Sequence, residues 1–585
     1  MPRLQLGLLL IPVVFFALIC TGCGGVSGNG QQGSSFTLTA SPSSLTLAQS
    51  SSAASIITVV DGSGFSGSVS LSASGLPSGV TAAFTPSTTS TNSTLTLTAS
   101  ATAAQGTSTM TVTGVSGSSS SSTTLSLKVT GPQPGGLIKH VVIIIQENRP
   151  PDNLFQDPVL IGEGADIQNY GYTSTGVKVT LTPVSGGLVT AYDLGHTHQS
   201  FLDACDYNSA TNSCAMDGAD KIGCAPNCPP NPQYQYVQKQ YVQPYWTMAE
   251  TYTFGDRMFQ TNQGPSFSAH QYLLAGTSLI CPEGSCPSGA TTTTAIADNP
   301  GGDQDPDGSY NAGCLAPPGA FVNTIDTSQA NPETPTVQLT NVLCMEHPTL
   351  TDLLNAANIG WKYYTPQAGS IWTAPNAIQH MCVPSPAYPS NTSECTGSDW
   401  VNNVVIEGSG AQIITDITNE QLASVVWVIP NGASSDHAAG NKGYGPSWVA
   451  SIVNAIGESP YWSDTAIFVM WDDWGGWYDH VQPSSIRNSY EYGLRVPLIV
   501  ISPYAKAKYI SHVNHDFGSV LKFVETNFSL GEIDPSLGFA DSRSDNMSDC
   551  FDFTQTPLVF TPIQSSKDAK FFLNDKSPPT APDND

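Results

Sequence analysis

The amino-acid sequence changes character at "GPQPGG", residues 131–136, and this change requires at least two separate domains. From Phe36 to Thr130 the chain is rich in Ser, Thr, Val, Leu, Ala and Gly, and Asp61 and Lys128 are its only charged residues. All ten histidines lie after the Pro/Gly segment. A chain of 585 residues also exceeds what one hydrophobic core usually organises. We therefore predict a first domain over residues 36–130, a linker over 131–136 and a second domain over 137–565.

Residues 36–130 show the alternation of half-buried β-strands. Runs such as "STLTLTAS" and "TTLSLKVT" alternate polar and apolar side chains and are separated by Gly, Pro and Ser turns, which is typical of an antiparallel β-sandwich. The stretch "LPSGVTAAFTP" resembles the immunoglobulin-like repeats of secreted bacterial proteins. Because the segment has no titratable cluster, we expect an all-β immunoglobulin-like sandwich with a spacer or adhesion role.

The first 23 residues have the pattern of an export signal. Arg3 precedes the apolar run "LQLGLLLIPVVFFALIC" and the small-residue box "TGCGG". The box resembles a bacterial lipoprotein cleavage site. It predicts lipidation of Cys23, a flexible tether over residues 24–35, and an exported, lipid-anchored protein at the outer membrane, in the periplasm or on the cell surface. Plain secretion and a membrane-spanning anchor are the alternatives. Residues 566–585 are predicted to be a flexible tail.

Eleven further cysteines lie between Cys205 and Cys550, and in an exported protein most should form disulfides. The sequence does not determine their connectivity, and the odd number leaves at least one thiol unpaired. A zinc site at "CAPNCPP" is the alternative for two of them, but no second Cys/His pair stands at a suitable spacing. Near neighbours that could close loops are Cys205/Cys214, Cys224/Cys228, Cys281/Cys286 and Cys382/Cys395.

The charge balance argues against nucleic acid as a partner. The chain has 46 acidic and 19 basic residues, a formal net charge of −27, whereas neutralising a phosphate backbone requires Lys and Arg. An acidic chain suits a protein that holds cations, although a solvated acidic surface explains the charge equally well.

The second domain alternates continuous apolar runs with amphipathic ones. The runs "HVVIIIQ", "ASVVWVIP", "TAIFVMW" and "VPLIVISP" indicate strands buried on both faces, and "TLTDLLNAAN", "PSWVASIVNAIGES" and "GSVLKFVETNF" have helical periodicity. This pattern predicts an α/β domain with a mainly parallel sheet. In such sheets ligands bind at the carboxyl ends of the strands.

Two of these strands end in carboxylates. "HVVIIIQ" is followed by Glu147 and Asn148, and "TAIFVMW" by Asp472 and Asp473. Clustered carboxylates repel each other unless a cation lies among them, so the pattern predicts a divalent metal site at this sheet edge. All-oxygen ligands suit Mg²⁺, Mn²⁺ or Ca²⁺, and Zn²⁺ or iron would fit if a histidine joined. The alternative is that each acid only caps a turn.

Between these strands, "GPSFSAHQYLLAGT" predicts a tight turn at Gly264-Pro265 and a helix over residues 267–276. Ser266 lies at the start of this helix, where unpaired backbone N–H groups stabilise an anionic phosphate; the alternative is an ordinary N-cap serine. An imidazole could protonate the leaving oxygen of a phosphoester. The histidines in loop-like settings are His196, His437, His480, His512 and His515.

Six segments occur in the order found in the bacterial phosphoesterase family, which includes non-haemolytic-type phospholipases C and respiratory-burst-inhibiting acid phosphatases. The resemblance covers roughly residues 137–560. It implies an alkaline-phosphatase-like, three-layer α/β/α catalytic domain that hydrolyses phosphate mono- or diesters. The segments are "IKHVVIIIQENRPPDNLF", "CAMDGAD", "GPSFSAHQYLLAGT", "SPYWSDTAIFVMWDDWGGWYDHVQP", "GLRVPLIVISPYAK" and "SHVNHDFGSVLKFVETNF".

Position by position, the resemblance implies a role for each candidate residue. The nucleophile, Thr in the phospholipases and Ser in the acid phosphatases, corresponds to Ser266. The first metal ligands correspond to Glu147 and Asn148, and the acidic pair to Asp472 and Asp473. Two catalytic histidines and four residues expected to bind substrate phosphate complete the set: His196 and His437, and His270, His480, His512 and Asp217.

The sequence departs from the family pattern around these positions. His270 stands where the family usually has Asn, and Trp474 replaces a polar group expected at the rim of the site. His198 stands where the family often has Trp, and "ENRPPDNLFQ" lacks the aromatic residue and the glycine of the family motif. The substrate contacts are therefore expected to differ, while the metal and nucleophile positions are retained.

The expected chemistry is metal-dependent hydrolysis through a phosphoserine on Ser266, with His196 or His437 protonating the leaving alcohol. The substrate would be a small phosphate ester or a phospholipid head group, and a serine nucleophile slightly favours phosphomonoesters. Two alternatives stay open: a phospholipase C acting on phosphodiester lipids, and a surface-binding lipoprotein whose phosphoesterase domain has lost activity.

Overall fold

The computed structural model describes residues 35–49, 52–62, 65–100, 103–132, 136–208, 210–280, 295–304, 310–327, 337–408, 411–483 and 490–579. The predicted export signal with Cys23, the tether over residues 24–34, linker residues 133–135 and the Cys281/Cys286 pair lie outside these residues. In the described part of the chain, no helix combines the length and apolarity needed to cross a membrane.

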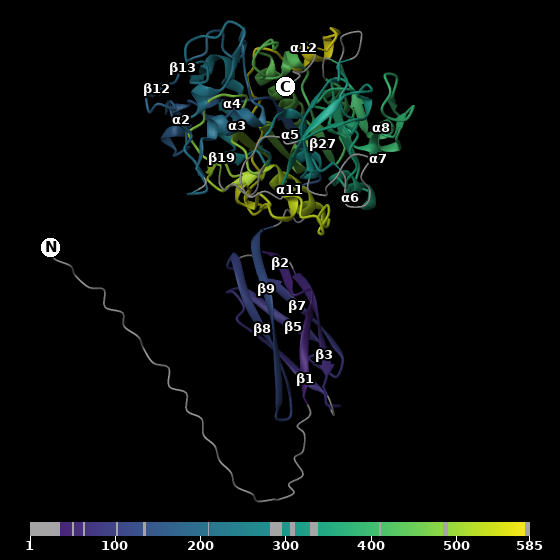
Figure 1. The fold of residues 1–585 in the computed structure, drawn as a ribbon. Helices are drawn as coiled ribbons and strands as arrows, with labels where there is room; N and C mark the ends of the chain where they lie inside the picture. Colours follow the sequence, from purple (N-terminus) through teal and green to yellow (C-terminus); the bar gives the residue numbers. More distant parts are fainter. Residues whose placement is uncertain are drawn as a thin grey trace, which may run out of the picture. The chain divides into compact units, whose positions relative to one another are not determined.

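The first unit is a β-sandwich with a core of its own (Figure 1). On β7 the buried residues Leu95 and Leu97 alternate with exposed ones, which is the pattern predicted from the sequence. One sheet has the order β1 (Phe36–Ser41), β3 (Ser52–Asp61), β7 (Asn92–Ala99) and β5 (Val80–Thr85). The other has the order β2 (Ser44–Gln49), β9 (Ser119–Pro132), β8 (Gly106–Ser116), β4 (Val69–Ser74) and β6 (Thr88–Thr89).

The second unit is built on a nine-stranded sheet. Five neighbouring strands are parallel, as predicted: β26, β23, β27, β10 and β28. Strand β29 is antiparallel to both of its neighbours, β28 and β19. No helix occurs between β28 and β29 among the described residues 472–483 and 490–494, so no crossover returns the chain in parallel. The order is β26 (Val404–Ile406), β23 (Trp361–Thr365), β27 (Val425–Val428), β10 (His140–Gln146), β28 (Thr465–Trp471), β29 (Arg495–Ile501), β19 (Thr253–Phe259) and β30 (Tyr509–Ser511), with β31 (His515–Asp516) beside β19.

Helices cover both faces of this sheet. Neighbouring strand residues point to opposite faces, so Phe468 and Trp471 of β28 point in opposite directions. Phe468 packs on Phe523 of α11, and Trp471 packs on Tyr245 of α4. One layer therefore contains α4 (Lys239–Thr251), α9 (Gln412–Thr418), α10 (Gly445–Gly457) and α12 (Ala569–Asn574), and the other contains α5 (Ser266–Ala275), α6 (Leu350–Ala356) and α11 (Phe517–Phe528).

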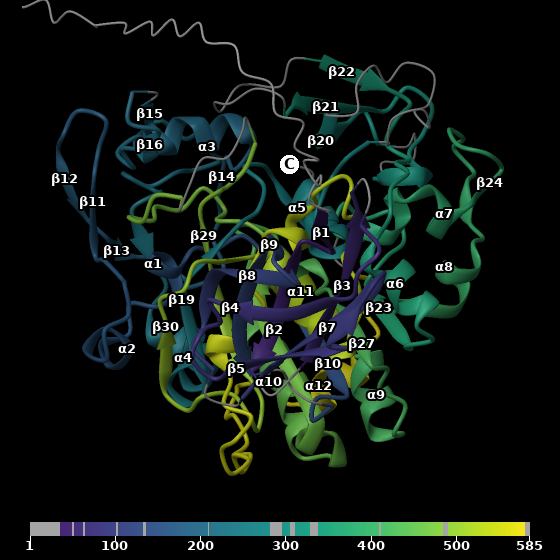
Figure 2. The same ribbon diagram turned by 90° about the horizontal axis from the view of Figure 1, so that it is seen from below.

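This three-layer α/β/α arrangement is the fold class expected from the sequence, and Figure 1 shows α12 and α11 on opposite sides of the unit. In the other view, Figure 2, short hairpins and helices surround these layers. The helices are α1 (Pro151–Leu154), α2 (Pro158–Gly162), α3 (His198–Cys205), α7 (Gln379–Cys382) and α8 (Ser398–Asn403). The strand groups are β11–β12 (170–172, 178–180), β13–β18 (182–183, 235–236), β14–β17 (193–194, 224–225), β15–β16 (207–208, 213–214), β20–β21–β22 (295–301, 321–326, 337–340) and β24–β25 (384–385, 394–395).

The structure differs from the sequence prediction at the carboxyl end. Helix α12 lies inside the predicted tail, and its Phe572 is 2% exposed because it packs against the core of the second unit. Apolar burial thus orders residues 569–574, although the surrounding sequence is polar and rich in proline.

Four disulfides are formed by described residues, and they include three of the predicted neighbour pairs. The Cys224–Cys228 bond excludes the zinc site considered at "CAPNCPP". Cys550 is the free cysteine of the described chain, and it is buried. The bonds are Cys205–Cys214, Cys224–Cys228, Cys314–Cys344 and Cys382–Cys395.

Candidate active site

The carboxyl ends of β10 and β28 meet, as expected of neighbouring parallel strands. The last strand pair is Gln146 with Trp471, so the residues that follow emerge side by side. The backbone N–H of Asn148 donates to Asp472 Oδ1 at 3.1 Å. Residues predicted from two sequence segments more than 300 positions apart therefore form one acidic group, and all of them are buried.

Ser266 is the first residue of α5 and reaches the same group. Its Oγ donates to Asp473 Oδ2 at 3.2 Å, and its side chain is almost fully buried. The preceding turn leaves no room for a side chain at Gly264, since a Cβ there would lie 2.0 Å from the Tyr490 hydroxyl oxygen. The helix therefore begins where the Gly-Pro turn predicted it, with a hydroxyl beside a carboxylate.

Two histidines approach Asn148 from the other side. His196 Nδ1 lies 2.7 Å from the Leu194 carbonyl oxygen, and His437 Nδ1 contacts the Ala438 carbonyl oxygen. A carbonyl only accepts, so each Nδ1 carries a proton and Nε2 is directed at the Asn148 amide, at 2.8 Å for His196 and 3.2 Å for His437. These two rings are 5.4 Å apart between centroids.

The other two polar residues of the strand end hold the loop that carries His437. Gln146 accepts from the Asp436 N–H at 3.0 Å and donates to the Ser434 carbonyl at 3.0 Å. Arg149 Nε donates to the Asp436 carbonyl at 2.8 Å, and its guanidinium lies 4.6 Å from the Trp477 ring centre. Burial lowers the pKa of Arg149 to about 10. The polar run after β10 thus has two parts: Glu147 and Asn148 face the acidic group, and their neighbours position a loop.

The Asn148 amide tests whether the site fits a cation. In one orientation its nitrogen donates to His196 Nε2 and to Asp473 Oδ2, and its oxygen lies 3.1 Å from Glu147 Oε2 and 3.2 Å from Asp472 Oδ1. Three oxygens then converge, and two of them belong to carboxyl groups. The flipped amide pairs with these oxygens, but it requires both histidines to donate from Nε2 as well as Nδ1, and so to be cationic. With neutral histidines, the convergent oxygens fit a divalent cation.

The burial of these carboxylates also favours a bound cation. Burial, followed by repulsion from Asp472 and Asp473, raises the pKa of Glu147 well above its usual value. Asp472 Oδ2 is buried and has no hydrogen-bond partner among the described residues. Burial lowers the pKa of His270 to about 4, so its imidazole is neutral. A buried group of carboxylates that lacks enough protons or cations is costly, and a bound cation removes that cost.

His270 lies inside this group. It is fully buried on α5, and its Nε2 lies 3.2 Å from Glu147 Oε1 and 3.9 Å from Asp472 Oδ2. Trp474, expected at the rim, is 0% exposed and belongs to the hydrophobic core. Asp193, which sequence reasoning did not select, lies with His196 and His437 in a group able to hold a metal; the signal was its position three residues before His196.

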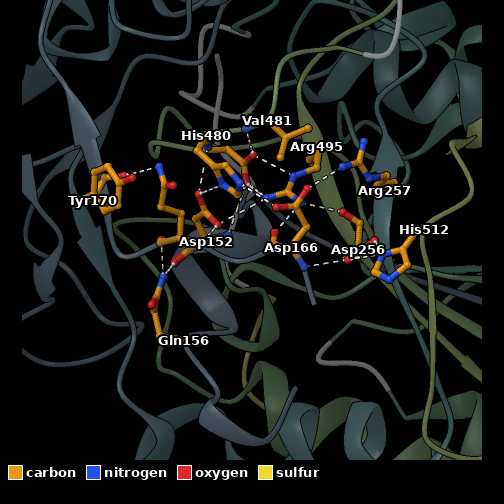
Figure 3. A network of polar contacts seen from close by, with 12 residues as sticks. Asp152, Gln156, Asp166, Tyr170, Asp256, Arg257, His480, Val481, Arg495 and His512 are labelled. Atoms are coloured by element: carbon orange, nitrogen blue, oxygen red, sulfur yellow. Dashed lines mark hydrogen bonds and ion pairs between the residues drawn. The ribbon is translucent and has the colours of Figure 1, made fainter. Parts of the chain in front are cut away.

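Two predicted phosphate-binding histidines lie elsewhere, in the network of Figure 3. His480 bridges Asp152 at 2.7 Å and Asp166 at 2.9 Å, and His512, whose side chain is 55% exposed, pairs with Asp256 at 2.9 Å. Arg495, at the start of β29, neutralises this acidic cluster and binds Asp479 at 2.8 Å. The resemblance selected both histidines, and in the structure they pair with these carboxylates rather than with the group around Ser266.

Asp217 also lies apart from the acidic group. It is half-buried, and its charged neighbours are Asp206 and Lys221. Burial and repulsion from Asp206 raise the pKa of Asp217. These neighbours give no support to the predicted phosphate contact.

A three-layer α/β/α unit with a serine, carboxylates and histidines gathered at the strand ends is an arrangement shared by many hydrolases. The model of the Phosphoesterase family matches residues 138–531, more than half of the chain, and the protein belongs to this family. The family assignment made from the six sequence segments is thus confirmed.

Several curated relatives are phospholipases C. The hemolytic phospholipase C of Pseudomonas aeruginosa is 22% identical over 68% of this chain and 53% of its own length. The non-hemolytic phospholipase C of Burkholderia pseudomallei is 29% identical over 20% of each chain, and phospholipase C B of Mycobacterium tuberculosis is 29% identical over 24% of this chain and 32% of its own. The chain thus spans about half or less of the length of these relatives.

Among solved structures, a protein of the alkaline phosphatase superfamily from Vibrio parahaemolyticus is 9% identical, covers 71% of this chain and 72% of its own, and gives a TM-score of 0.32. Domains 4 and 5 of the S-layer protein SbsC are 20% identical over 17% of this chain and 54% of their own, with a TM-score of 0.14.

Proposed function

We propose that the protein hydrolyses phosphate esters with the help of a divalent cation and through a phosphoserine on Ser266. The observation that carries this proposal is one buried group formed by Glu147, Asn148, Asp472 and Asp473, in which Asp473 accepts the hydrogen bond of the helix-initial Ser266. Membership of the phosphoesterase family supports it.

The cation would be held by the oxygens of Glu147, Asn148 and the two aspartates. When bound, it would supply positive charge that stabilises the serine oxygen and the phosphoryl oxygens. Asp473 accepts the hydrogen bond of Ser266 and so directs its Oγ toward the acidic group. The first turn of α5 adds unpaired backbone N–H groups beside the same oxygen.

The chain's own residues then account for bond making and proton transfer. As Ser266 Oγ forms a bond to phosphorus, its proton passes to Asp473 Oδ2, the acceptor of its hydrogen bond. The ester P–O bond breaks in the same step, and His196 or His437 in its protonated form gives a proton to the departing alcohol. Water then attacks phosphorus and gives a proton to the same histidine, while the proton held by Asp473 returns to Ser266 Oγ as the Ser–O–P bond breaks. This step releases phosphate or a phosphorylated head group and restores the hydroxyl. Both histidines direct Nε2 at the acidic group, the atom that such a transfer requires.

The direct test is Ser266→Ala, with Ser268→Ala as the matched control. Ser268 is equally buried on the same helix, but its hydroxyl bonds to Tyr490 at 2.7 Å and to Asn262 at 3.0 Å. We expect Ser266→Ala to lower kcat for p-nitrophenyl phosphate by about 10⁴-fold or more, while Ser268→Ala retains most activity. Near wild-type turnover in Ser266→Ala would remove this serine from the role.

A phospholipase C acting on phosphodiester lipids is the second candidate function, and the names of the curated relatives favour it. Comparing kcat/KM for p-nitrophenyl phosphate and for phosphatidylcholine distinguishes the two. A higher value for the lipid would assign the site to diesters. A surface-binding protein without activity is a third candidate, but the complete set of polar groups around Ser266 argues against it.

We further propose that the protein is exported and lipid-anchored through Cys23. The described disulfides support an oxidising compartment. Cells expressing the protein should incorporate labelled fatty acid into the wild type and not into Cys23→Ala. Equal labelling of the two would contradict the anchor.

A further inference from the structure

We propose that His270 is a ligand of the cation, so that the site is a mixed nitrogen and oxygen site that prefers a first-row transition metal such as Zn²⁺ to Mg²⁺ or Ca²⁺. This inference rests on the proposed function and refines it. The residue expected to bind phosphate would instead determine which metal the protein uses.

The placement of His270 follows from helix periodicity. Ser266 and His270 are four residues apart on α5, and residues at this spacing lie one above the other on the same helix face. Ser266 contacts Asp473, and His270 contacts Glu147 and approaches Asp472. One helix therefore presents both a hydroxyl and an imidazole to the same carboxylates.

The acceptors around His270 outnumber the protons available to them. Nε2 is 3.2 Å from Glu147 Oε1 and 3.9 Å from Asp472 Oδ2, and the latter oxygen is buried without a hydrogen-bond partner among the described residues. A single proton on Nε2 can satisfy one carboxylate only. A cation between the three side chains satisfies both carboxylates and the ring nitrogen, and one atom from each lies within 4.8 Å of the others.

An imidazole ligand changes metal preference. Mg²⁺ and Ca²⁺ favour oxygen ligands, whereas imidazole suits Zn²⁺, Fe²⁺ and Co²⁺. An asparagine at position 270 would supply an oxygen in place of this nitrogen. His270→Asn is therefore the informative substitution, because it is smaller, stays uncharged and removes the nitrogen ligand.

The test is metal binding by the full chain after chelation and dialysis. We expect His270→Asn to weaken Zn²⁺ binding by about 10- to 100-fold and to shift the visible absorption bands of the Co²⁺-loaded protein, while Mg²⁺ affinity changes little. His512→Asn is the matched control, since His512 is largely exposed and pairs with Asp256. His270→Gln is the second variant, and circular dichroism checks that both position-270 variants fold.

The outcomes separate the two proposals. Equal Zn²⁺ affinities and superimposable Co²⁺ spectra in wild type and His270→Asn would overturn His270 as a ligand and leave metal-dependent hydrolysis standing. A wild-type protein that binds no divalent cation at one equivalent would overturn both. Loss of Zn²⁺ affinity in the two position-270 variants but not in His512→Asn is the result that the structure leads us to expect.

Discussion

Gly475 shows how closely the two strand ends approach each other. Its φ of +63° lies in the left-handed region, and a Cβ at this position would be 2.1 Å from the Asn148 carbonyl oxygen. Gly538 has a similar φ of +66° but open space around its Cβ position. The pair therefore separates backbone strain from a steric clash at the candidate site.

We expect Gly538→Ala to lower the free energy of unfolding by about 1–2 kcal/mol, the cost of the left-handed backbone alone. Gly475→Ala should cost about 3 kcal/mol or more and should also lower kcat, because Asn148 has to move. Urea denaturation together with initial rates measures both effects. Equal stability and equal kcat for the two variants would show that the close approach at Asn148 is unimportant.

At the scale of elements, the end of β10 also positions a loop. Gln146 bonds to the backbone of Ser434 and Asp436, nearly 290 positions away. The sequence predicted that polar residues after this strand would hold a charged ligand, and it did not predict their second use. A hydrogen bond to a distant backbone leaves no periodicity or spacing in the sequence, because any residue can offer its N–H and C=O.

Gln146→Leu tests this positioning role. The substitution leaves the buried N–H of Asp436 without an acceptor, which should cost about 1–3 kcal/mol of stability. Because His437 follows directly, we also expect kcat to fall by about tenfold with little change in metal affinity. Unfolding and steady-state kinetics provide the two readouts. A variant with unchanged kcat would contradict the assignment of this loop.

The network around His480 predicts a pH dependence of stability. Burial opposes the charged imidazolium, but the hydrogen bond and charge of Asp152 outweigh it and raise the pKa of His480 to about 9 from 6.5. A raised pKa contributes stability that is complete below about pH 6.5 and is lost as the pH rises through about 9.

His480→Gln should therefore be less stable than the wild type by up to about 3 kcal/mol near pH 6, and this difference should vanish above about pH 9. Unfolding free energies of both proteins measured between pH 6 and pH 10 provide the comparison. A difference independent of pH would mean that the charge of His480 does not contribute to the network.

For the whole molecule, composition and periodicity predicted the two units and an α/β domain with a mainly parallel sheet, because each strand and helix has its own burial pattern. The three α/β/α layers were implied by the resemblance to the phosphoesterase family. The positions of Glu147, Asn148, Asp472 and Asp473, directly after two buried strands, predicted that these residues would meet at one edge of the sheet. The positions of His480 and His512 could not be predicted, because they depend on ion pairs with Asp152 and Asp256 in a network that also contains Arg495. These charges come together only in the folded chain. Sequence proximity to a motif therefore did not place them in the site.

The two units have separate hydrophobic cores, so the second should work alone. A chain that begins at residue 131 is expected to retain kcat/KM for p-nitrophenyl phosphate within about threefold of the full-length value. Purified proteins of both lengths, compared at equal metal loading, give the answer. Failure of the shorter chain to fold or to turn over would show that the sandwich contributes to the catalytic unit.

Acid quenching of the enzyme during turnover, followed by peptide mass spectrometry, examines the central chemistry most directly. Metal-loaded protein mixed with a phosphomonoester and stopped within milliseconds should carry a phosphoryl group on the peptide that contains Ser266. Chelated protein should carry none. Phosphate found on another residue, or turnover with no covalent phosphopeptide at any quench time, would contradict a serine nucleophile at this site.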